Sequence, residues 1–341
     1  MHMADALLSP AVGGTMWAAS AGAIIYCSRK LRQEMDGGKA PLMGVLGAFI
    51  FAAQMINFTI PATGSSGHLG GGLLLAVLLG PAAACITIAS VLVVQALFFA
   101  DGGLLALGCN IFNLGVLPAC IAYPFIYKPL VGSAPSTTRI TVAAMVAAIV
   151  GLQLGAFAVV LETVASGISA LPLAAFAGLM QPIHLAIGVV EGLVTAAVVS
   201  FVYQARPEII ESVQQARLLG QTPLRKVLAL FLGAALLTGG FVSWFASENP
   251  DGLEWAIAKV TGAEELAGPE QGLHARLAGF QASIAFLPDY TFKQSGQQPE
   301  NKAGQESSLG SSVAGVVGGL LTLAMALLSG LLLRRRQGKV A

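Results

Sequence analysis

His2, the second residue of the chain, has the type and position to hold a metal ion together with the chain terminus. The Met1 amine, the His2 backbone nitrogen and the His2 imidazole can close two fused chelate rings on one ion. A fourth nitrogen would complete a square plane, the geometry that indicates Ni(II) or Cu(II) among divalent metals. His68 is a candidate for that nitrogen. The alternative is that His2 lies in a frayed, exposed terminus.

The segment 54–72 joins two apolar stretches through a loop rich in glycine and hydroxyl groups, and it contains His68. Glycine lets the backbone approach a ligand closely, and irregular backbone at membrane depth must be buried in protein or line a cavity. We expect Asn57, Ser65 and Ser66 to orient an imidazole at this site. The alternative is an exposed turn with His68 facing water.

Two later segments place polar side chains within apolar sequence. Asn110 and Asn113 are three residues apart and share a helix face, so they either bond to loop carbonyls beside the metal or join two helices. His184 and Glu191 are seven apart, two turns along one face. They could pass a metal ion or proton onward, or bond neighbouring helices, which is the interpretation that we favour.

The composition indicates an all-α polytopic membrane protein. The chain is 55% hydrophobic and only 10% charged, with a mean hydropathy of +0.77, whereas a soluble domain is about 25% charged. A transmembrane helix needs about 20 apolar residues. We expect nine spans, with the third and fourth separated at Cys85 and a possible break at Gly80-Pro81; they lie near residues 11–28, 41–60, 70–84, 86–100, 105–127, 140–162, 181–203, 227–246 and 313–333.

Most of the 18 Lys and Arg residues fall in alternate connections and in the C-terminal tail. The positive-inside rule then places the N-terminus outside and the C-terminus in the cytoplasm. This orientation puts the terminus and the His68 loop on the same side, where they can meet. The first 28 residues contain no Lys or Arg, which argues against a cleavable signal peptide. The chain has no phosphate-binding loop motif, so we expect it to bind no nucleotide.

Several of these motifs occur together and in order in one known family. They are Met1-His2, Gln-Met-x-Asn-Phe, Gly-Ser-Ser-Gly-His-Leu-Gly-Gly, Asp-Gly-Gly-Leu, Leu-Gly-x-Asn-x-x-Asn and His-x-x-Ile-Gly-x-x-Glu-Gly-Leu. With them, residues 1–205 resemble the NikM and CbiM family, the substrate-binding membrane subunits of nickel and cobalt energy-coupling-factor transporters. We call residues 1–205 the first half and expect seven spans in it.

Residues 227–341, the second half, resemble the NikN-type accessory subunit that is fused in NikMN proteins. Two spans would flank an external segment, 247–312, that carries the motif Pro250-Asp251-Gly252-Leu253-Glu254. We call residues 250–254 the PDGLE motif. Asp251 and Glu254 also fit a capping box that opens a helix over 252–260. Residues 206–226 are the expected cytoplasmic linker.

The resemblance implies that Met1, through its amine, His2, through both nitrogens, and His68 bind the ion. It implies Ni(II), or Co(II), as the transported substrate of a non-enzymatic subunit in the cell (inner) membrane. The implied partners are a NikQ/CbiQ-like coupling subunit, NikO/CbiO-like ATPases and membrane lipid, but no nucleic acid. One departure is that residues 59–63 replace the usual Pro-Val-Pro-Gly-Gly, so we expect a less kinked loop.

Four other functions remain in competition, of which a purely structural or receptor role explains neither the terminus nor the His68 loop. The same role for Co(II) would supply corrinoid synthesis. A stand-alone secondary transporter or channel would need a chain of ionisable residues through its spans. Glu162, Glu191 and His184 are too few for such a chain. An intramembrane metalloenzyme is disfavoured because the sequence has no H-E-x-x-H motif. In the first span, Ala18 with Gly22 and Ala19 with Ala23 make small-xxx-small pairs that could face a partner subunit or serve internal packing.

Overall fold

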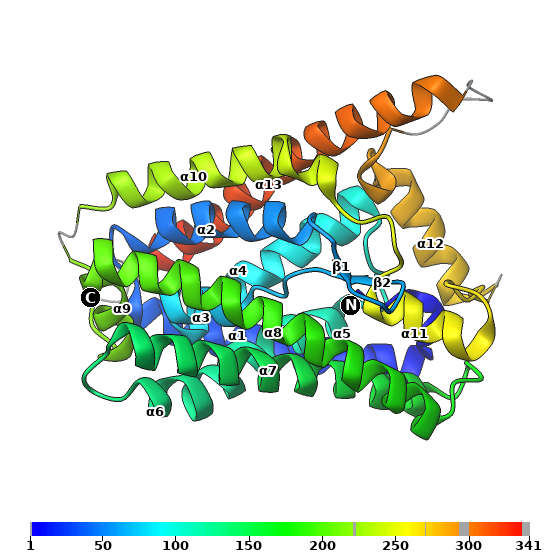
Figure 1. The fold of residues 1–341 in the computed structure, drawn as a ribbon, viewed down its shortest axis with the longest axis horizontal. Coiled ribbons are helices and arrows are strands. Elements are labelled where there is room, and N and C mark those ends of the chain that lie inside the picture. Colours follow the sequence, from blue (N-terminus) through cyan, green and yellow to red (C-terminus); the bar gives the residue numbers. More distant parts are fainter. Residues whose placement is uncertain (1, 221–222, 270, 293–299, 336–341) are drawn as a thin grey trace.

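The computed structural model describes residues 2–220, 223–269, 271–292 and 300–335 of the 341-residue chain. Met1, a predicted metal ligand, lies outside the described residues. Most helices run roughly along one long axis, and the described chain is mainly helical, with a single small hairpin (Figure 1). Short 3-10 and π segments, labelled η, extend several of the helices.

The first half forms a bundle in which α7 and α8 are the longest pair. Its helical elements are η1 (Asp5–Leu7), α1 (Pro10–Glu34), α2 (Lys39–Gln54), α3 (Gly72–Leu79), α4 (Pro81–Val94), η2 (Gln95–Phe99), α5 (Leu107–Ile111), η3 (Phe112–Tyr127), α6 (Lys128–Val131), α7 (Thr137–Ser166) and α8 (Leu173–Ala205).

Among the described residues, five helices are long and apolar enough to cross a membrane. They are Pro81–Phe99, Leu107–Val131, Thr137–Ser166, Leu173–Ala205 and Ser308–Arg334, and α2 is a shorter apolar helix. This supports a membrane protein with several spans. The count of nine spans and the orientation of the termini stay predictions.

The expected boundary between the third and fourth spans at Cys85 is wrong, and the alternative break at Gly80-Pro81 is confirmed. The chain breaks at Gly80, whose φ of +86° suits glycine. Pro81 then opens α4, where its missing N–H costs no helical hydrogen bond. Cys85 lies buried inside α4. The break makes α3 a short helix whose start lies just after the His68 loop.

The second half adds two long helices to α2 and places two short ones at the end that carries the N-terminus (Figure 1). Its elements, with the linker helix α9, are α9 (Pro207–Gln214), α10 (Arg225–Gly240), η4 (Val242–Phe245), α11 (Gly252–Thr261), α12 (Leu273–Ile284), η5 (Pro288–Tyr290) and α13 (Glu300–Arg335).

Glycines allow the long helices of the second half to pack closely. A Cβ added at Gly315 would lie 2.3 Å from the Gly239 carbonyl oxygen, so α10 and α13 touch backbone to backbone. A Cβ at Gly318 would lie 2.0 Å from the Phe51 ring of α2. Small residues at a helix crossing permit the close van der Waals contact that holds helices together in lipid. The two halves are therefore packed into one unit.

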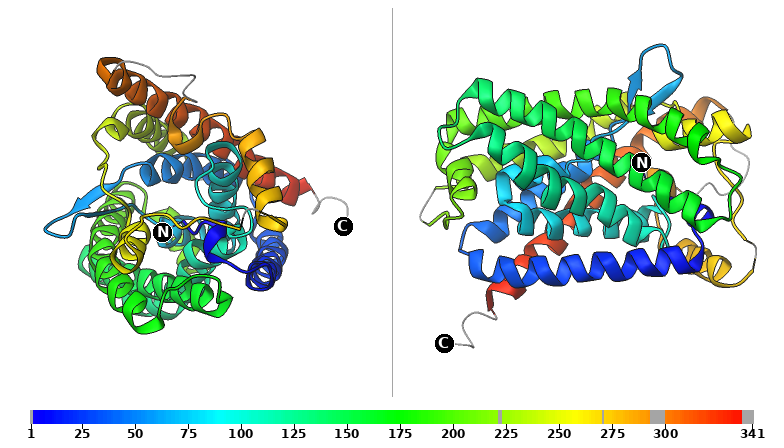
Figure 2. Two further views of the ribbon diagram at one scale, coloured as in Figure 1. Left: turned by 90° about the vertical axis from the view of Figure 1, so that its right-hand side faces the viewer. Right: turned by 90° about the horizontal axis from the view of Figure 1, so that it is seen from below.

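The hairpin pairs β1 (Phe58–Ile60) with β2 (Ser65–Gly67) in antiparallel register, with Thr59 opposite Ser66. Its turn keeps positive φ at Ala62 (+64°) and Gly64 (+75°). Ala62 thus adopts the left-handed conformation that glycine usually takes, and the expectation of a loop less kinked than that of the family stays a prediction. Figure 2 (left) looks at the end of the molecule where this hairpin and the N-terminus lie.

The PDGLE motif forms the capping box that its sequence predicts. The Asp251 carboxylate accepts hydrogen bonds from the backbone N–H groups of Leu253 and Glu254, at 2.8 and 2.9 Å. The Glu254 carboxylate accepts one from the Asp251 N–H at 2.9 Å. The helix α11 begins at Gly252, as expected. This cap fixes the direction of the Asp251 side chain at the start of α11.

Candidate metal centre

The described N-terminal residues are held firmly in place. The Met3 backbone N–H donates to Asn110 Oδ1 at 2.8 Å, and Asn110 Nδ2 donates to the Met3 carbonyl at 3.3 Å. The Gly103 N–H also donates to the Met3 carbonyl, at 2.9 Å. Met3 is fully buried. The alternative of a frayed, exposed terminus is therefore wrong for the residues from His2 onward.

The His68 loop is held by both halves of the chain. Its strand β2 pairs with the PDGLE motif through a parallel bridge between Ser66 and Asp251, and the Ser66 N–H donates to the Pro250 carbonyl at 2.8 Å. On the hairpin turn, the Thr63 carbonyl accepts from Trp255 Nε1 at 2.9 Å. His68 is only 9% exposed. The alternative of an exposed turn with His68 in water is wrong.

His2 and His68 are stacked face to face. Their ring centroids are 5.0 Å apart and their planes differ by 8°. Each side chain is 8% exposed. Burial removes water from both rings and lowers the pKa of each to about 3. Both imidazoles are therefore neutral at physiological pH, which is the state in which histidine binds a metal.

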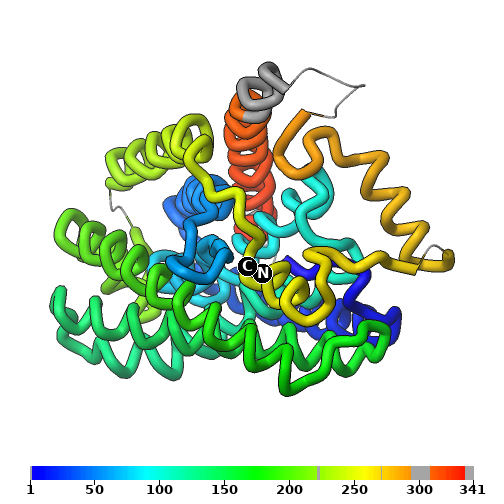
Figure 3. Tube along the Cα trace, turned by 45° about the vertical axis from the view of Figure 1, so that its right-hand side comes forward, coloured from blue at the N-terminus to red at the C-terminus, as the bar shows by residue number. Residues whose placement is uncertain are grey.

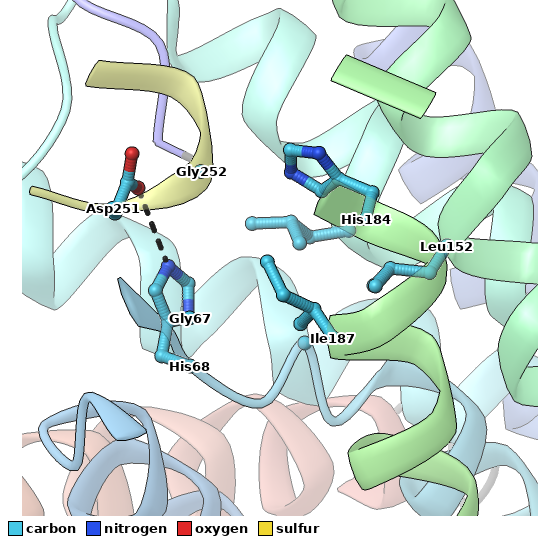
Figure 4. A pocket seen from close by; sticks show the side chains of 9 residues that line it. Gly67, His68, Leu152, His184, Ile187, Asp251 and Gly252 are labelled. Atoms are coloured by element: carbon cyan, nitrogen blue, oxygen red, sulfur yellow. Dashed lines mark ion pairs between the residues drawn. The ribbon is translucent and has the colours of Figure 1, made fainter. Parts of the chain in front are cut away.

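A backbone contact selects which nitrogen of His68 is available. His68 Nδ1 lies 3.1 Å from the Leu69 carbonyl oxygen. Because a carbonyl only accepts, Nδ1 must carry the proton, and Nε2 then presents its lone pair. Nε2 points at Asp251 Oδ2, 3.9 Å away (Figure 4). This is the usual arrangement of a metal-binding histidine, whose other nitrogen donates to a carbonyl or carboxylate.

Asp101 has the corresponding position beside His2. His2 Nδ1 lies 3.2 Å from Asp101 Oδ1, and the Tyr290 hydroxyl donates to Asp101 Oδ2. Among the described residues, the buried His2 Nε2 has no hydrogen-bond partner. Tyr290 belongs to the second half, as does Asp251. The second half therefore contacts the carboxylate beside His2 and supplies the carboxylate beside His68.

Asp101 and Asp251 were not predicted as site residues from the sequence. Both lie in recognised motifs, Asp-Gly-Gly-Leu and PDGLE, and both segments lie in connections expected on the outer side. An aspartate in a short glycine-containing connection on the side of His2 was the available signal. The capping box already explained why an aspartate stands at position 251. The sequence therefore gave no separate reason to expect its contact with His68.

The predicted supporting residues divide by role. Ser66 Oγ donates to the Asn249 carbonyl at 2.7 Å, and Ser65 Oγ donates to the Ser66 carbonyl at 3.1 Å. The Asn57 carbonyl accepts from the Ser247 N–H at 2.7 Å. These bonds fix the loop and join it to the second half. Direct orientation of an imidazole by these three residues stays a prediction.

The two amides of the first half also have separate partners. Asn110 binds the Met3 backbone, as described, and so positions the residue next to His2. Asn113 Nδ2 instead donates to Glu162 Oε2 of α7 at 2.8 Å. One amide therefore supports the candidate centre and the other joins two helices.

The contacts of His184 and Glu191 are those of structural bonding. His184 Nδ1 lies 2.8 Å from the Met180 carbonyl one turn earlier in α8. Glu191 accepts from the Gly70 and Gly71 N–H groups at 2.9 and 3.0 Å, and so anchors the end of the His68 loop. His184 lines a cavity of about 10 Å³ together with His68 and Asp251 (Figure 4). A relay role for this pair stays a prediction.

In the described part of the chain, no group of three or more His, Cys, Asp or Glu side chains has an arrangement suited to a metal ion. A site that uses two imidazoles with backbone and terminal nitrogens would not form such a group. The donor chemistry that the described residues offer is thus two neutral imidazoles with carboxylates nearby.

Comparison with family models assigns both halves. Residues 2–209 match the model of the CbiM cobalt uptake substrate-specific transmembrane region. Residues 225–335 match the PDGLE domain. The boundary between these matches falls within the expected linker, 206–226.

Relatives resemble the chain along most of its length. A putative fused nickel transport protein NikMN of Archaeoglobus fulgidus is 31% identical over 330 residues, covering 95% of this chain and 96% of the relative. The fused nickel transport protein NikMN of Rhodobacter capsulatus is 31% identical, covering 85% and 88%. A crystal structure of a truncated transition metal transporter is 30% identical with a TM-score of 0.54, and it covers 60% of this chain and 99% of that chain.

Proposed function

Because the chain belongs to the CbiM family of cobalt uptake substrate-specific transmembrane regions and carries a PDGLE domain, we propose that it is the substrate-binding subunit of a metal importer. The chain is a multi-pass membrane protein and a component of metal transport. Its proposed substrate is Ni(II), which it captures on the outer side. Partner subunits then drive uptake with ATP.

The proposed site uses four nitrogens: the Met1 amine, the His2 backbone nitrogen, the His2 imidazole and His68 Nε2. The observation that carries this proposal is the stacking of two buried, neutral imidazoles at 5.0 Å, one of them beside the chain terminus. Their protonation state and their distance suit two ligands of one ion. The deprotonated backbone nitrogen would offset part of the metal charge.

Metal binding changes the partner of His2. The chelate ring from the His2 backbone nitrogen closes through Nδ1, which in this structure lies 3.2 Å from Asp101. Nδ1 must leave Asp101 to bind the ion. Asp101 and Asp251 then provide negative charge beside a divalent cation, an attraction that is strong where water is excluded.

Nickel is favoured over cobalt by geometry and by relatives. Four nitrogens in a plane suit Ni(II), and two relatives that match along most of the chain are described as nickel transport proteins. The description of the family model names cobalt uptake. A relative from Sorangium cellulosum that is 29% identical is described as a cobalt transport protein. Co(II) is therefore the second candidate. Equimolar competition, read by elemental analysis, would decide between them.

The exposed face of α1 suits docking of a coupling subunit. Gly14, Ala18, Ala19 and Gly22 are exposed on it. A Cβ added at Gly14 or Gly22 would meet no atom within 4 Å. Ala23 instead packs partly against the core. A stripe of small exposed residues lets another membrane helix approach closely, so we assign this face to a NikQ/CbiQ-like subunit that acts with NikO/CbiO-like ATPases.

The decisive experiment measures bound nickel in protein with a native N-terminus and in protein with one residue added before Met1. The extension removes the amine from the chelate, so retained nickel should fall from about one ion per chain to a few per cent. His68→Ala should lose it too. His274→Gln is the matched control, because His274 bonds to the Leu8 carbonyl and is not one of the two stacked rings. Full retention by the extended protein would reject the site.

Stand-alone transport is tested by nickel uptake into vesicles that hold only this chain. No uptake is expected without the partner subunits and ATP. Uptake at the full rate in their absence would favour a secondary transporter or channel instead.

A further inference from the structure

A second, larger cavity opens beside the stacked histidines. It has a volume of about 380 Å³ and lies between the N-terminal segment, the loop at 100–103 and the α11 and α12 region of the second half. In Figure 3, α11 is the yellow segment close to the N-terminus, and α12 is the orange-yellow segment to its right. His2 is among the lining residues. The cavity therefore reaches the candidate metal centre.

The described lining of this cavity is acidic and contains no Lys or Arg. Both halves contribute carboxylates to it: Asp5 and Asp101 from the first half, and Asp251, Glu254, Glu264, Glu265 and Asp289 from the second half. A concave surface lined by one sign of charge focuses its field and concentrates the opposite ion.

Exposure of these carboxylates decreases toward the histidines. Glu264, Glu265 and Asp289 are exposed, whereas Asp101 and Asp251 are 23% and 15% exposed. At the buried end, His2 lines the same cavity with a side chain that is only 8% exposed. A candidate ligand of the nitrogen site thus lies on the wall of the acidic cavity and connects the two.

We propose that this cavity, which we call the acidic antechamber, holds a hydrated divalent cation before the cation passes to the nitrogen site. The inference deepens the proposed function and rests on it. The carboxylates would hold the ion mainly through its water shell, and the ion would lose water as it moves past Asp101 and Asp251 toward His2 and His68. The second half would then serve as the entrance of the first.

The size of the antechamber fits a hydrated ion. Six waters at about 30 Å³ each occupy roughly 180 Å³, less than the volume of about 380 Å³. Oxygen ligands and water suit Mg(II) and Mn(II) as well as Ni(II). The antechamber would therefore collect divalent cations with little selectivity, and the nitrogen ligands would select among them.

The pKa values of the lining carboxylates show that crowded negative charge is unfavourable in this cavity. Burial and the charge of Asp251 raise the pKa of Glu254 to about 7. Burial and the charge of Asp101 raise the pKa of Asp289. The pKa of each group is raised because its negative charge lies in a partly dry place close to another carboxylate. A bound cation would relieve the same repulsion.

The first test compares loading rates of two matched double variants of the full chain. Glu264→Gln/Glu265→Gln removes two exposed carboxylates of the antechamber, and Glu208→Gln/Glu211→Gln removes two from α9 at the opposite end (Figure 1). At low salt, the antechamber variant should bind Ni(II) about 3- to 10-fold more slowly. High salt should abolish the difference. Final nickel stoichiometry should equal that of wild type.

Equal loading rates in all three proteins would overturn the antechamber, as would an equal loss in both variants. The second test does not depend on the nitrogen site. It measures Mn(II) binding by electron paramagnetic resonance in His68→Ala protein with one residue added before Met1. One weakly bound, Mg(II)-displaceable Mn(II) is expected, and adding Glu264→Gln/Glu265→Gln should weaken its binding at least 3-fold. Unchanged Mn(II) binding overturns the antechamber, whereas wild-type protein that retains no nickel rejects only the proposed nitrogen site.

Discussion

His68 Nε2 and Asp251 Oδ2 face each other at 3.9 Å, although the two residues belong to different halves of the chain. The proton on His68 lies at Nδ1, which contacts the Leu69 carbonyl. The two facing atoms are therefore both acceptors, and they are too far apart for a hydrogen bond. A cation placed near both would be attracted to each. The PDGLE motif thus contributes charge to a ligand of the first half.

Asp251→Asn tests this contribution. Asparagine is as good an N-cap as aspartate, so α11 should keep its start while the negative charge near His68 is lost. We expect nickel affinity to fall roughly 10-fold, as when a residue that supports a metal ligand is changed. Competition with a chelator of known affinity measures it. Glu208→Gln, on α9 and outside the antechamber, is the control, and an equal loss in both variants would contradict a specific role for Asp251.

Proton release on nickel binding tests the state of the imidazoles. Burial lowers the pKa of His2 and His68 to about 3, so neither ring carries a proton to lose at pH 7. The amine, with a usual pKa of about 7.7 to 8.0, and the His2 backbone N–H should together release about two protons. Calorimetry in buffers of different ionisation enthalpy counts them.

The same pKa shifts set a pH dependence of stability. The pKa of each histidine is lower in the folded protein than the unfolded value of about 6.5, so the unfolded state binds more protons between about pH 6.5 and 3. The contribution of the neutral rings to the free energy of unfolding is complete above about pH 6.5. It is lost as the pH falls toward about 3. Metal-free protein should melt at a lower temperature at pH 5 than at pH 7. His2→Gln/His68→Gln should reduce this difference, and an unchanged difference would contradict the assignment.

Ala62→Gly should stabilise the hairpin turn. Ala62 has a φ of +64°, a conformation that costs an L-residue about 1 to 2 kcal/mol. Glycine removes that cost. Because glycine also makes the unfolded chain more flexible, it lowers the stability of the folded state by about 0.4 to 1 kcal/mol. The net gain should be about 0.5 to 1 kcal/mol, measured by unfolding in detergent. Gly64→Ala, at φ +75° with no atom near its Cβ, should lose a similar amount, and stabilisation by both changes would contradict the argument.

Glu191→Gln should loosen the His68 loop. The carboxylate accepts from two backbone N–H groups, of Gly70 and Gly71, whereas an amide offers a single acceptor oxygen without charge. We expect a loss of about 1.5 to 3 kcal/mol in stability, as for a hydrogen bond to a charged group, and faster nickel dissociation. Glu162→Gln is the control, since Glu162 binds Asn113 rather than the loop. It should leave the nickel dissociation rate unchanged, and equal acceleration in both variants would argue against loop anchoring.

The sequence by itself determined the features that depend on local pattern. Hydropathy over windows of about 20 residues predicts membrane helices without knowledge of their neighbours. The capping box at Asp251 and Glu254 depends on residues three apart, and it formed as predicted. The order of the motifs along the chain identified the family. The same motifs predicted His2 and His68 as metal ligands, and the structure brings these two rings together.

The tertiary structure alone decided which distant groups meet. Spacing placed His184 and Glu191 on one face of α8, but only the packed bundle directs Glu191 to the Gly70 and Gly71 backbone. Pairing of β2 with the PDGLE motif brings Asp251 to His68. Such contacts join segments far apart in sequence, and they depend on helix packing and backbone pairing that no local pattern encodes. The acidic cavity follows from the same packing, because its walls come from both halves.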